Sequence, residues 1–327
     1  MHGVQSYVEP PEEDSARLIS LAKEALEKWK QKDFSAEALS LVNRVLELNP
    51  DEYSLWNYHK RFVLNELERI SQNEPSSLEE AQKQLFDSEF DLTQRALYRH
   101  PKAYSAWQHR IFLLKIANCY LPSTIYELYF KRELEICAKL LDLDDRNFHG
   151  WAHRMRVGDI RGLQPTREEL QFVTERINAN FSNYSAWHHR SRILPILYKD
   201  RQEQYFLAVQ EDLELVKQAI FTEPEDQSAW FYFHWLLRGA PSCHATVSVL
   251  DIGNEILKKE LSTLEELLVL EPKCKWALLI KFYLLQTFGD FDHAEAVLTT
   301  LQELDPLRNG YYVYLKEKMR RWSSKSH

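Results

Sequence analysis

The chain has 327 residues, of which 44% are hydrophobic, enough to bury a substantial core. It contains 8 glycines and 12 prolines, too few for the turns of an all-β fold or the phosphate loops of a doubly wound sheet. The formal net charge is −8, with acidic and basic residues interspersed, which excludes a basic surface for nucleic acid or anionic membrane. These numbers favour a helical protein whose partners are other proteins.

The cysteines and the first residues bear on location. No Cys-x-x-Cys pair and no histidine at metal-ligand spacing occurs near any cysteine, so we expect reduced core or surface thiols. The cysteines are Cys119, Cys137, Cys243 and Cys274. The amino terminus lacks the basic and apolar regions of a signal peptide, and no apolar run reaches the ~18 residues of a membrane span. We therefore expect a cytoplasmic protein that does not insert into membranes.

In chain order, residues 1–14 are predicted to form a flexible tail and residues 15–32 an amphipathic capping helix. A tryptophan motif then recurs at intervals of 36 to 51 residues, each copy opening a helix after a Pro, Asn or Asp break. The motif tryptophans are Trp56, Trp107, Trp151, Trp187, Trp230 and Trp276. An amphipathic stretch precedes each copy, so each unit is predicted to be a helical hairpin.

Six to seven such hairpins are predicted. They lie near residues 35–70, 80–118, 126–160, 167–198, 203–239, 245–289 and 291–321. The last is degenerate, with Tyr311 and Tyr312 where a tryptophan would be expected. Because one hairpin cannot cover both of its apolar faces, successive hairpins must stack. The expected fold is an all-α superhelix, with residues 15–327 forming a single repeat domain.

Tryptophan and a cation share a helix face in several copies, because they are three residues apart. The pairs are Trp107 with Arg110, Trp151 with Arg154 and Trp187 with Arg190, and Trp56 with Lys60 is a looser version. We interpret the tryptophans as core residues between repeats, and the cations as partners of acids on adjoining helices.

The residues at the start of each motif helix vary more between repeats than the tryptophan and arginine positions do. They lie where backbone N–H groups and the helix dipole favour anions. They include Lys102, Tyr104, Asn147, His149 and Tyr184. From the pattern alone, Lys102 is either a solvated loop lysine or a cation aimed at a ligand phosphate. Periodicity does not decide between the two.

A second set of polar residues is histidine-rich. It consists of His109, His149, His153, His188 and His189. They come from three repeats with no consistent cysteine or carboxylate spacing, so packing and hydrogen bonding are favoured over zinc binding. Without a Gly-x-Ser-x-Gly, Walker or His-Glu-x-x-His motif, the chain does not carry a self-sufficient active site.

The motifs at residues 104–110 (Tyr-Ser-Ala-Trp-x-His-Arg), 147–151 (Asn-Phe-His-Gly-Trp) and 183–190 (Asn-Tyr-Ser-Ala-Trp-His-His-Arg) resemble the repeats of protein prenyltransferase alpha subunits. The resemblance spans nearly the whole chain. It implies helical hairpins wrapped around an obligate beta subunit, which carries the catalytic zinc and most of the isoprenoid pocket. Magnesium is a further candidate cofactor, and no metal is expected in this chain.

By this resemblance, the lysine of Pro101-Lys102-Ala103-Tyr104 reaches the isoprenoid diphosphate. It also implies an active-site rim at the beta interface. The rim residues are Tyr104, Asn147, His149, Tyr184 and His188. Phe148 replaces a tyrosine often found in the family, which puts one hydroxyl contact in doubt.

The Rab type of alpha subunit is the better match, because residues 180–185 and 221–232 resemble it and the proline-rich leader of the other type is missing. Ser105 also stands where the other type has a glutamine that holds a CaaX carboxylate. The resemblance therefore implies geranylgeranyl transfer, from geranylgeranyl diphosphate, to carboxy-terminal cysteines of Rab GTPases presented by Rab escort protein.

Two rival interpretations remain: an alpha subunit of the farnesyl or type I geranylgeranyl enzyme, and a repeat scaffold without catalytic role. The immunoglobulin-like and leucine-rich modules of many Rab-type subunits are absent from the sequence, and we expect core catalysis not to need them. His2 could be a movable zinc ligand, although a tail residue is the simpler interpretation.

Overall fold

The computed structural model describes residues 12–72, 75–162, 165–238 and 253–323, and these ranges contain α-helices, one short 3-10 helix and no strand. His2, Cys243 and most of the predicted tail lie outside them. The α-helices are α1 (Glu12–Gln31), α2 (Ala36–Leu48), α3 (Tyr53–Ile70), α4 (Pro75–Arg99), α5 (Tyr104–Tyr120), α6 (Ser123–Leu143), α7 (Phe148–Arg161), α8 (Arg167–Ala179), α9 (Tyr184–Leu197), α10 (Gln202–Thr222), α11 (Gln227–Leu237), α12 (Asn254–Leu270), α13 (Lys275–Phe288), α14 (Phe291–Leu304) and α15 (Asn309–Ser323). The 3-10 helix is η1 (Pro306–Arg308).

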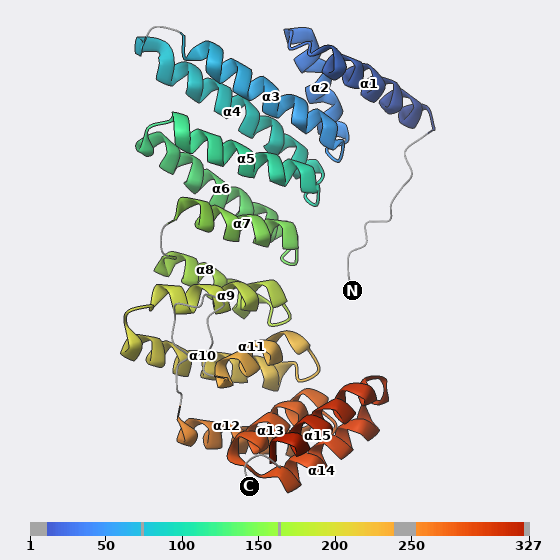
Figure 1. Ribbon diagram of the computed structural model, residues 1–327, viewed down its shortest axis with the longest axis vertical. Coiled ribbons are helices and arrows are strands. Elements are labelled where there is room, and N and C mark those ends of the chain that lie inside the picture. The colour runs from blue at the N-terminus through green and yellow to red at the C-terminus, as the bar shows by residue number, and fades with distance from the viewer. Residues whose placement is uncertain (1–11, 73–74, 163–164, 239–252, 324–327) are drawn as a thin grey trace. The chain divides into compact units, whose positions relative to one another are not determined.

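The helices form two compact units, Met1–Leu163 and Gln164–His327. In the first, α4 packs on α5 and α6 on α7, while α3, α5 and α7 follow one another as neighbours (Figure 1). In the second, α8 packs on α9, α10 on α11 and α12 on α13, and α9, α11 and α13 are neighbours. Each unit is thus a stack of antiparallel hairpins. The predicted all-α hairpin-repeat class is confirmed.

The first and second helix of each hairpin are called A and B. The B helices α3, α5, α7, α9, α11 and α13 lie next to one another within each unit. Short polar side chains fix where several helices begin, because they accept hydrogen bonds from otherwise unpaired backbone N–H groups. Ser35 caps α2, Asn147 caps α7, Thr166 caps α8 and Asp226 caps α11.

The core lies between helix layers within each unit. In the first unit one cluster is centred on Trp56 and Trp107 and a second on Phe86 and Phe90. In the second unit a cluster around Phe282 joins α13, α14 and α15. Among the described helices, none combines the length and the apolar character that crossing a membrane requires. That residues 15–327 form one domain stays a prediction.

Candidate functional site

Lys102 lies on the short loop between α4 and α5, and its side chain is 66% exposed. Its Nζ is 3.2 Å from Oδ2 of Asp144, the residue that directly follows α6. An exposed ion pair of this kind is worth only about 0–1 kcal/mol, since both ions stay hydrated. Lys102 can therefore leave Asp144 for an anionic ligand at little cost in free energy.

Tyr104 and His149 lie beside this lysine. Tyr104 is the first residue of α5 and is 58% exposed, and its ring meets that of His149 edge-on at 6.2 Å. Partial burial lowers the pKa of His149, and the positive charge of Lys102 lowers it further. Near neutral pH the site therefore presents one cation, a phenol and a neutral imidazole. These three predicted residues are brought together.

Asn147 belongs to the same group but has no exposed surface. Its side-chain oxygen accepts hydrogen bonds from the backbone N–H groups of His149 (3.0 Å) and Gly150 (3.2 Å). Its amide nitrogen donates to the carbonyl of Pro101 at 3.1 Å. Asn147 thus joins α7 to the loop that carries Lys102, and in this chain it positions other groups.

Phe148, the first residue of α7, is 62% exposed and lies against His149 with ring centroids 4.0 Å apart. It occupies the same place in its helix as Tyr104 does in α5, three residues before the motif tryptophan. Tyr53 has this position in α3 and is 67% exposed. The first unit therefore presents a row of exposed rings at the amino ends of its B helices.

Tyr184 and His188 form a separate group in the second unit. Their rings are parallel within 5° at a centroid distance of 6.2 Å, and Phe231 meets Tyr184 edge-on at 6.1 Å. They line a shallow pocket of about 180 Å³ together with Trp235 and other aromatic residues. Burial lowers the pKa of His188, which keeps this pocket uncharged.

The motif tryptophans close the turn between the two helices of a hairpin. In five hairpins the indole Nε1–H donates to the backbone carbonyl six residues earlier, at 2.8 or 2.9 Å. The pairs are Trp56 with Pro50, Trp107 with Pro101, Trp151 with Asp145, Trp187 with Phe181 and Trp230 with Pro224. All five rings are buried. The motif thus fixes the loop geometry as well as filling the core.

Trp276 departs from this pattern and corrects the predicted register of its hairpin. It is only partly buried, and its Nε1–H donates to the carbonyl of Glu225 in the preceding hairpin, at 3.2 Å. Six residues after Pro272, where the motif tryptophan would stand, lies the buried Leu278. Trp276 is two positions earlier in its helix, which points its ring toward the surface.

The motif arginines are buried, and two of them bind acids of the next A helix. The Arg110 Nε–H donates to Glu133 of α6 at 2.9 Å, and both side chains are fully buried. Arg190 makes the equivalent contact with Asp212 of α10, at 2.9 Å. The guanidinium of Arg154 donates to the backbone carbonyl of Leu134 at 3.0 Å.

Motif histidines also contact acids, each on the A helix of the histidine's own hairpin, and His153 shares Glu133 with Arg110. His109 contacts Glu89 at 3.0 Å, and His153 contacts Glu133 at 2.7 Å. In each pair the histidine lies 20 residues after its acid. His189 and Glu169 repeat this spacing at 2.8 Å. Sequence reasoning missed these acids, although their constant distance before the motif histidine is a signal that could have found them.

The contacts with Arg110 and His153, together with burial, determine the charge of Glu133 and of His153. The pKa of Glu133 is lowered to about 2, because Arg110 and the hydrogen bond from His153 outweigh the effect of burial. Burial, in turn, lowers the pKa of His153. The acid is therefore ionised and the histidine is neutral in the folded chain. Within the described ranges, no group of three or more His, Cys, Asp or Glu side chains is arranged to hold a metal ion.

Comparison with known proteins then places the chain. The sequence profile of the protein prenyltransferase alpha subunit repeat matches residues 35–66, 86–117, 130–157, 166–197 and 209–240. The geranylgeranyl transferase type-2 subunit alpha of Dictyostelium discoideum is 34% identical over 93% of this chain and 91% of that relative. The chain belongs to the protein prenyltransferase alpha subunit family.

A further relative and a solved structure support this family membership. The mouse geranylgeranyl transferase type-2 subunit alpha is 38% identical over 74% of this chain, and the match covers 41% of the mouse protein. The chain thus spans less than half the length of that relative. A Candida albicans protein geranylgeranyltransferase-I chain, solved in complex with GGPP, has the same fold, with a TM-score of 0.64. Its identity is 21%, over 93% of this chain and 91% of that one.

Proposed function

We propose that this chain is the alpha subunit of a heterodimeric type-2 geranylgeranyl transferase. The observation that carries the proposal is similarity to a relative of that name over more than nine tenths of both chains. The helical hairpins, with exposed rings at the amino ends of their B helices, provide the surface for a beta subunit. The heterodimer acts in the cytoplasm, transferring geranylgeranyl from its diphosphate to a cysteine thiol.

The division of labour follows from the residues present. Zinc on the beta subunit would bind the sulfur of the acceptor cysteine and keep it as a thiolate, which is the nucleophilic form of cysteine. The described residues of this chain offer no donor set for that metal. Lys102 meets the diphosphate, where its ammonium offsets the negative charge that develops as the leaving group departs. The weak ion pair with Asp144 lets Lys102 turn to the diphosphate when it arrives.

The acceptors are carboxy-terminal cysteines of Rab GTPases presented by Rab escort protein. Ser105, the second residue of α5, is half-buried and lies next to Tyr104. A serine hydroxyl reaches less far than a glutamine amide and cannot bind a CaaX carboxylate in the same way. Efficient transfer to free CaaX peptides without escort protein would favour the CaaX-type alternative instead.

The test is coexpression with a barrel-type beta subunit, followed by single-turnover geranylgeranyl transfer to a Rab–escort complex. Lys102→Ala should lower the rate at least about tenfold, roughly 1.4 kcal/mol of barrier. Lys273→Ala is the matched control, because Lys273 also follows the proline of its interhelix loop and is exposed. The control should leave the rate unchanged.

Each other result has a definite meaning. Equal rates for both variants would remove the diphosphate role of Lys102 while leaving the subunit assignment in place. Failure of the wild-type chain to bind any barrel-type beta subunit would favour the scaffold alternative and overturn the proposed function.

A further inference from the structure

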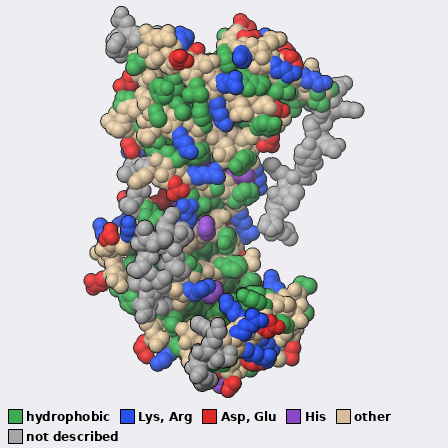
Figure 2. All heavy atoms as spheres, in the orientation of Figure 1, with side chains coloured by type: hydrophobic (Ala, Val, Ile, Leu, Met, Phe, Trp, Pro, Cys, Tyr) green, Lys and Arg blue, Asp and Glu red, His purple; other side chains and the backbone are tan. Residues whose placement is uncertain are grey.

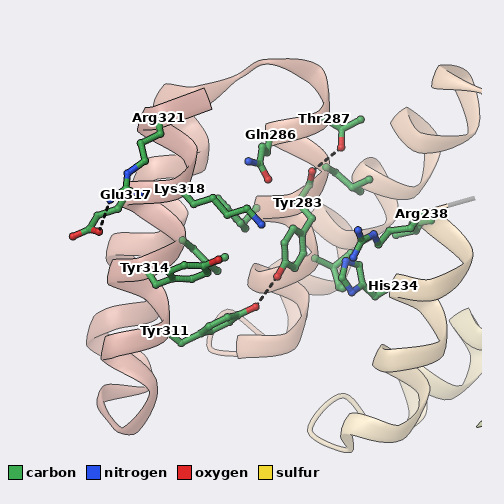
Figure 3. A pocket seen from close by; sticks show the side chains of 15 residues that line it. His234, Arg238, Tyr283, Gln286, Thr287, Tyr311, Tyr314, Glu317, Lys318 and Arg321 are labelled. Atoms are coloured by element: carbon green, nitrogen blue, oxygen red, sulfur yellow. Dashed lines mark hydrogen bonds and ion pairs between the residues drawn. The ribbon is translucent and has the colours of Figure 1, made fainter. Parts of the chain in front are cut away.

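A pocket of about 870 Å³ lies within the second unit between α11, α13 and α15 (Figure 3). Its centre is aromatic: the ring of His234 stacks on Tyr283 at 4.5 Å, and the hydroxyls of Tyr283 and Tyr311 are 2.7 Å apart. Leu237 and Ile280 add apolar surface. The pocket is large enough for several side chains of a bound polypeptide.

Two cations reach this pocket from different helices. Arg238 approaches from the end of α11 and Lys318 from α15, with Tyr283 between them (Figure 3). Neither side chain has an ion pair or hydrogen bond with another described residue. By contrast, Lys316 and Arg320, also on α15, contact Thr299 and Glu295 of α14.

The positive charges of Arg238 and Lys318 are not neutralised by an acidic residue of the pocket lining. Glu317 is the acidic residue among those lining the pocket, and it lies 3.8 Å from Arg321, which matches its charge. His234 adds no positive charge near neutral pH, since burial and the nearby Arg238 lower its pKa to about 4. Figure 2 shows basic side chains gathered with hydrophobic ones over this part of the unit. The pocket therefore has two uncompensated positive charges above an aromatic floor.

We propose that this Arg238–Lys318 pocket docks an acidic segment of the beta subunit, with a carboxylate between the two cations and an apolar neighbour against the tyrosines. The inference rests on the proposed function. It also rests on continuity along α11 and α13, where Phe231 contacts both Tyr184 and Trp276. A partner covering these exposed rings can continue along the same helices into the pocket.

The experiment measures the dissociation constant of the purified heterodimer by titrating labelled beta subunit with the full chain. The double variant R238Q/K318Q should weaken binding at least about tenfold, as expected when a buried carboxylate loses its partners. It should also flatten the dependence of binding on salt concentration, because two charges no longer contribute to attraction. A purely structural effect would not change that slope.

The matched control is K316Q/R320Q, which removes two charges from the same helix outside the pocket. Circular dichroism of both variants checks that the chain still folds. Equal affinity for wild type and R238Q/K318Q, or equal loss in both double variants, overturns the inference and leaves a small anion or another protein as the occupant. Absence of a wild-type heterodimer instead overturns the proposed function, so the two failures are distinguishable.

Discussion

At the scale of single residues, the unusual feature is a pair of buried acids, Glu133 and Asp212, each held by an arginine from one hairpin and a histidine or tyrosine from the next. Asp212 illustrates it, because Arg190 and the hydroxyl of Tyr232 both contact its carboxylate. Burying a charge costs several kcal/mol unless its partners replace the lost water. These contacts therefore stabilise one particular stacking of hairpins.

Removal of one partner should be costly. Arg110→Met leaves Glu133 buried with His153 as its remaining side-chain partner, and should lower the free energy of unfolding by about 3–5 kcal/mol. Urea denaturation of the purified chain measures this. Arg69→Met removes an exposed ion pair to Glu66 and should cost less than about 1 kcal/mol. Similar losses in both variants would contradict a special role for the buried pair.

Residue-scale prediction from sequence was uneven, for physical reasons. Tryptophan and arginine three residues apart must share a helix face, so the burial of Trp107 beside Arg110 followed from spacing. The acid that binds Arg110 lies on another helix, 23 residues away, and helix periodicity carries no information about that distance. Asn147 was predicted at the active-site rim, but it is a buried cap of α7. An asparagine at a helix start is compatible with either role, so the sequence does not distinguish them.

At the scale of elements, the hairpins were predictable because each A helix has one apolar face and each B helix begins at a motif. The structure moves some boundaries: α1 begins at Glu12 rather than at 15, and the predicted start of the sixth hairpin at 245 lies outside the described residues. Trp276 shows the limit of the pattern. Counting tryptophans does not detect a two-position shift, which shows in the spacing from Pro272 and in the hydrogen bond to Glu225.

The cap of α7 gives an element-scale prediction. Asn147→Ala removes two hydrogen bonds to the start of the helix and one to Pro101, and should cost about 1–2 kcal/mol. Asn147→Asp keeps the accepting oxygen and should recover part of that loss. Thermal unfolding followed by circular dichroism compares the three chains. An alanine variant as stable as wild type would show that the cap does not hold this loop.

At the scale of the whole molecule, the repeated acid–histidine pairs set the response to pH. Burial lowers the pKa values of His109 and His153, so the unfolded chain binds more protons than the folded chain below the ordinary histidine pKa of 6.5. Glu89 and Glu133 stay ionised in the folded chain down to a pKa of about 2, against 4.5 when unfolded. Both effects lower stability as the pH falls.

We therefore expect the urea midpoint to fall from pH 7 to pH 5, and then further toward pH 3 as the unfolded chain takes up protons at its glutamates. His153→Gln should reduce the dependence between pH 7 and pH 5. A midpoint that is constant over this range would contradict neutral buried histidines.

The constant spacing between each motif histidine and its acid has a consequence for how this chain tolerates insertions. Within a hairpin the separation is 20 residues in all three histidine pairs. Between hairpins, the corresponding separations are 30 for His59 with Glu89, 23 for Arg110 with Glu133 and 22 for Arg190 with Asp212. Added residues are thus accommodated where a B helix passes to the next A helix. An engineered tag or epitope belongs in such a connection, for example near residue 72, and not in the turn that a tryptophan closes.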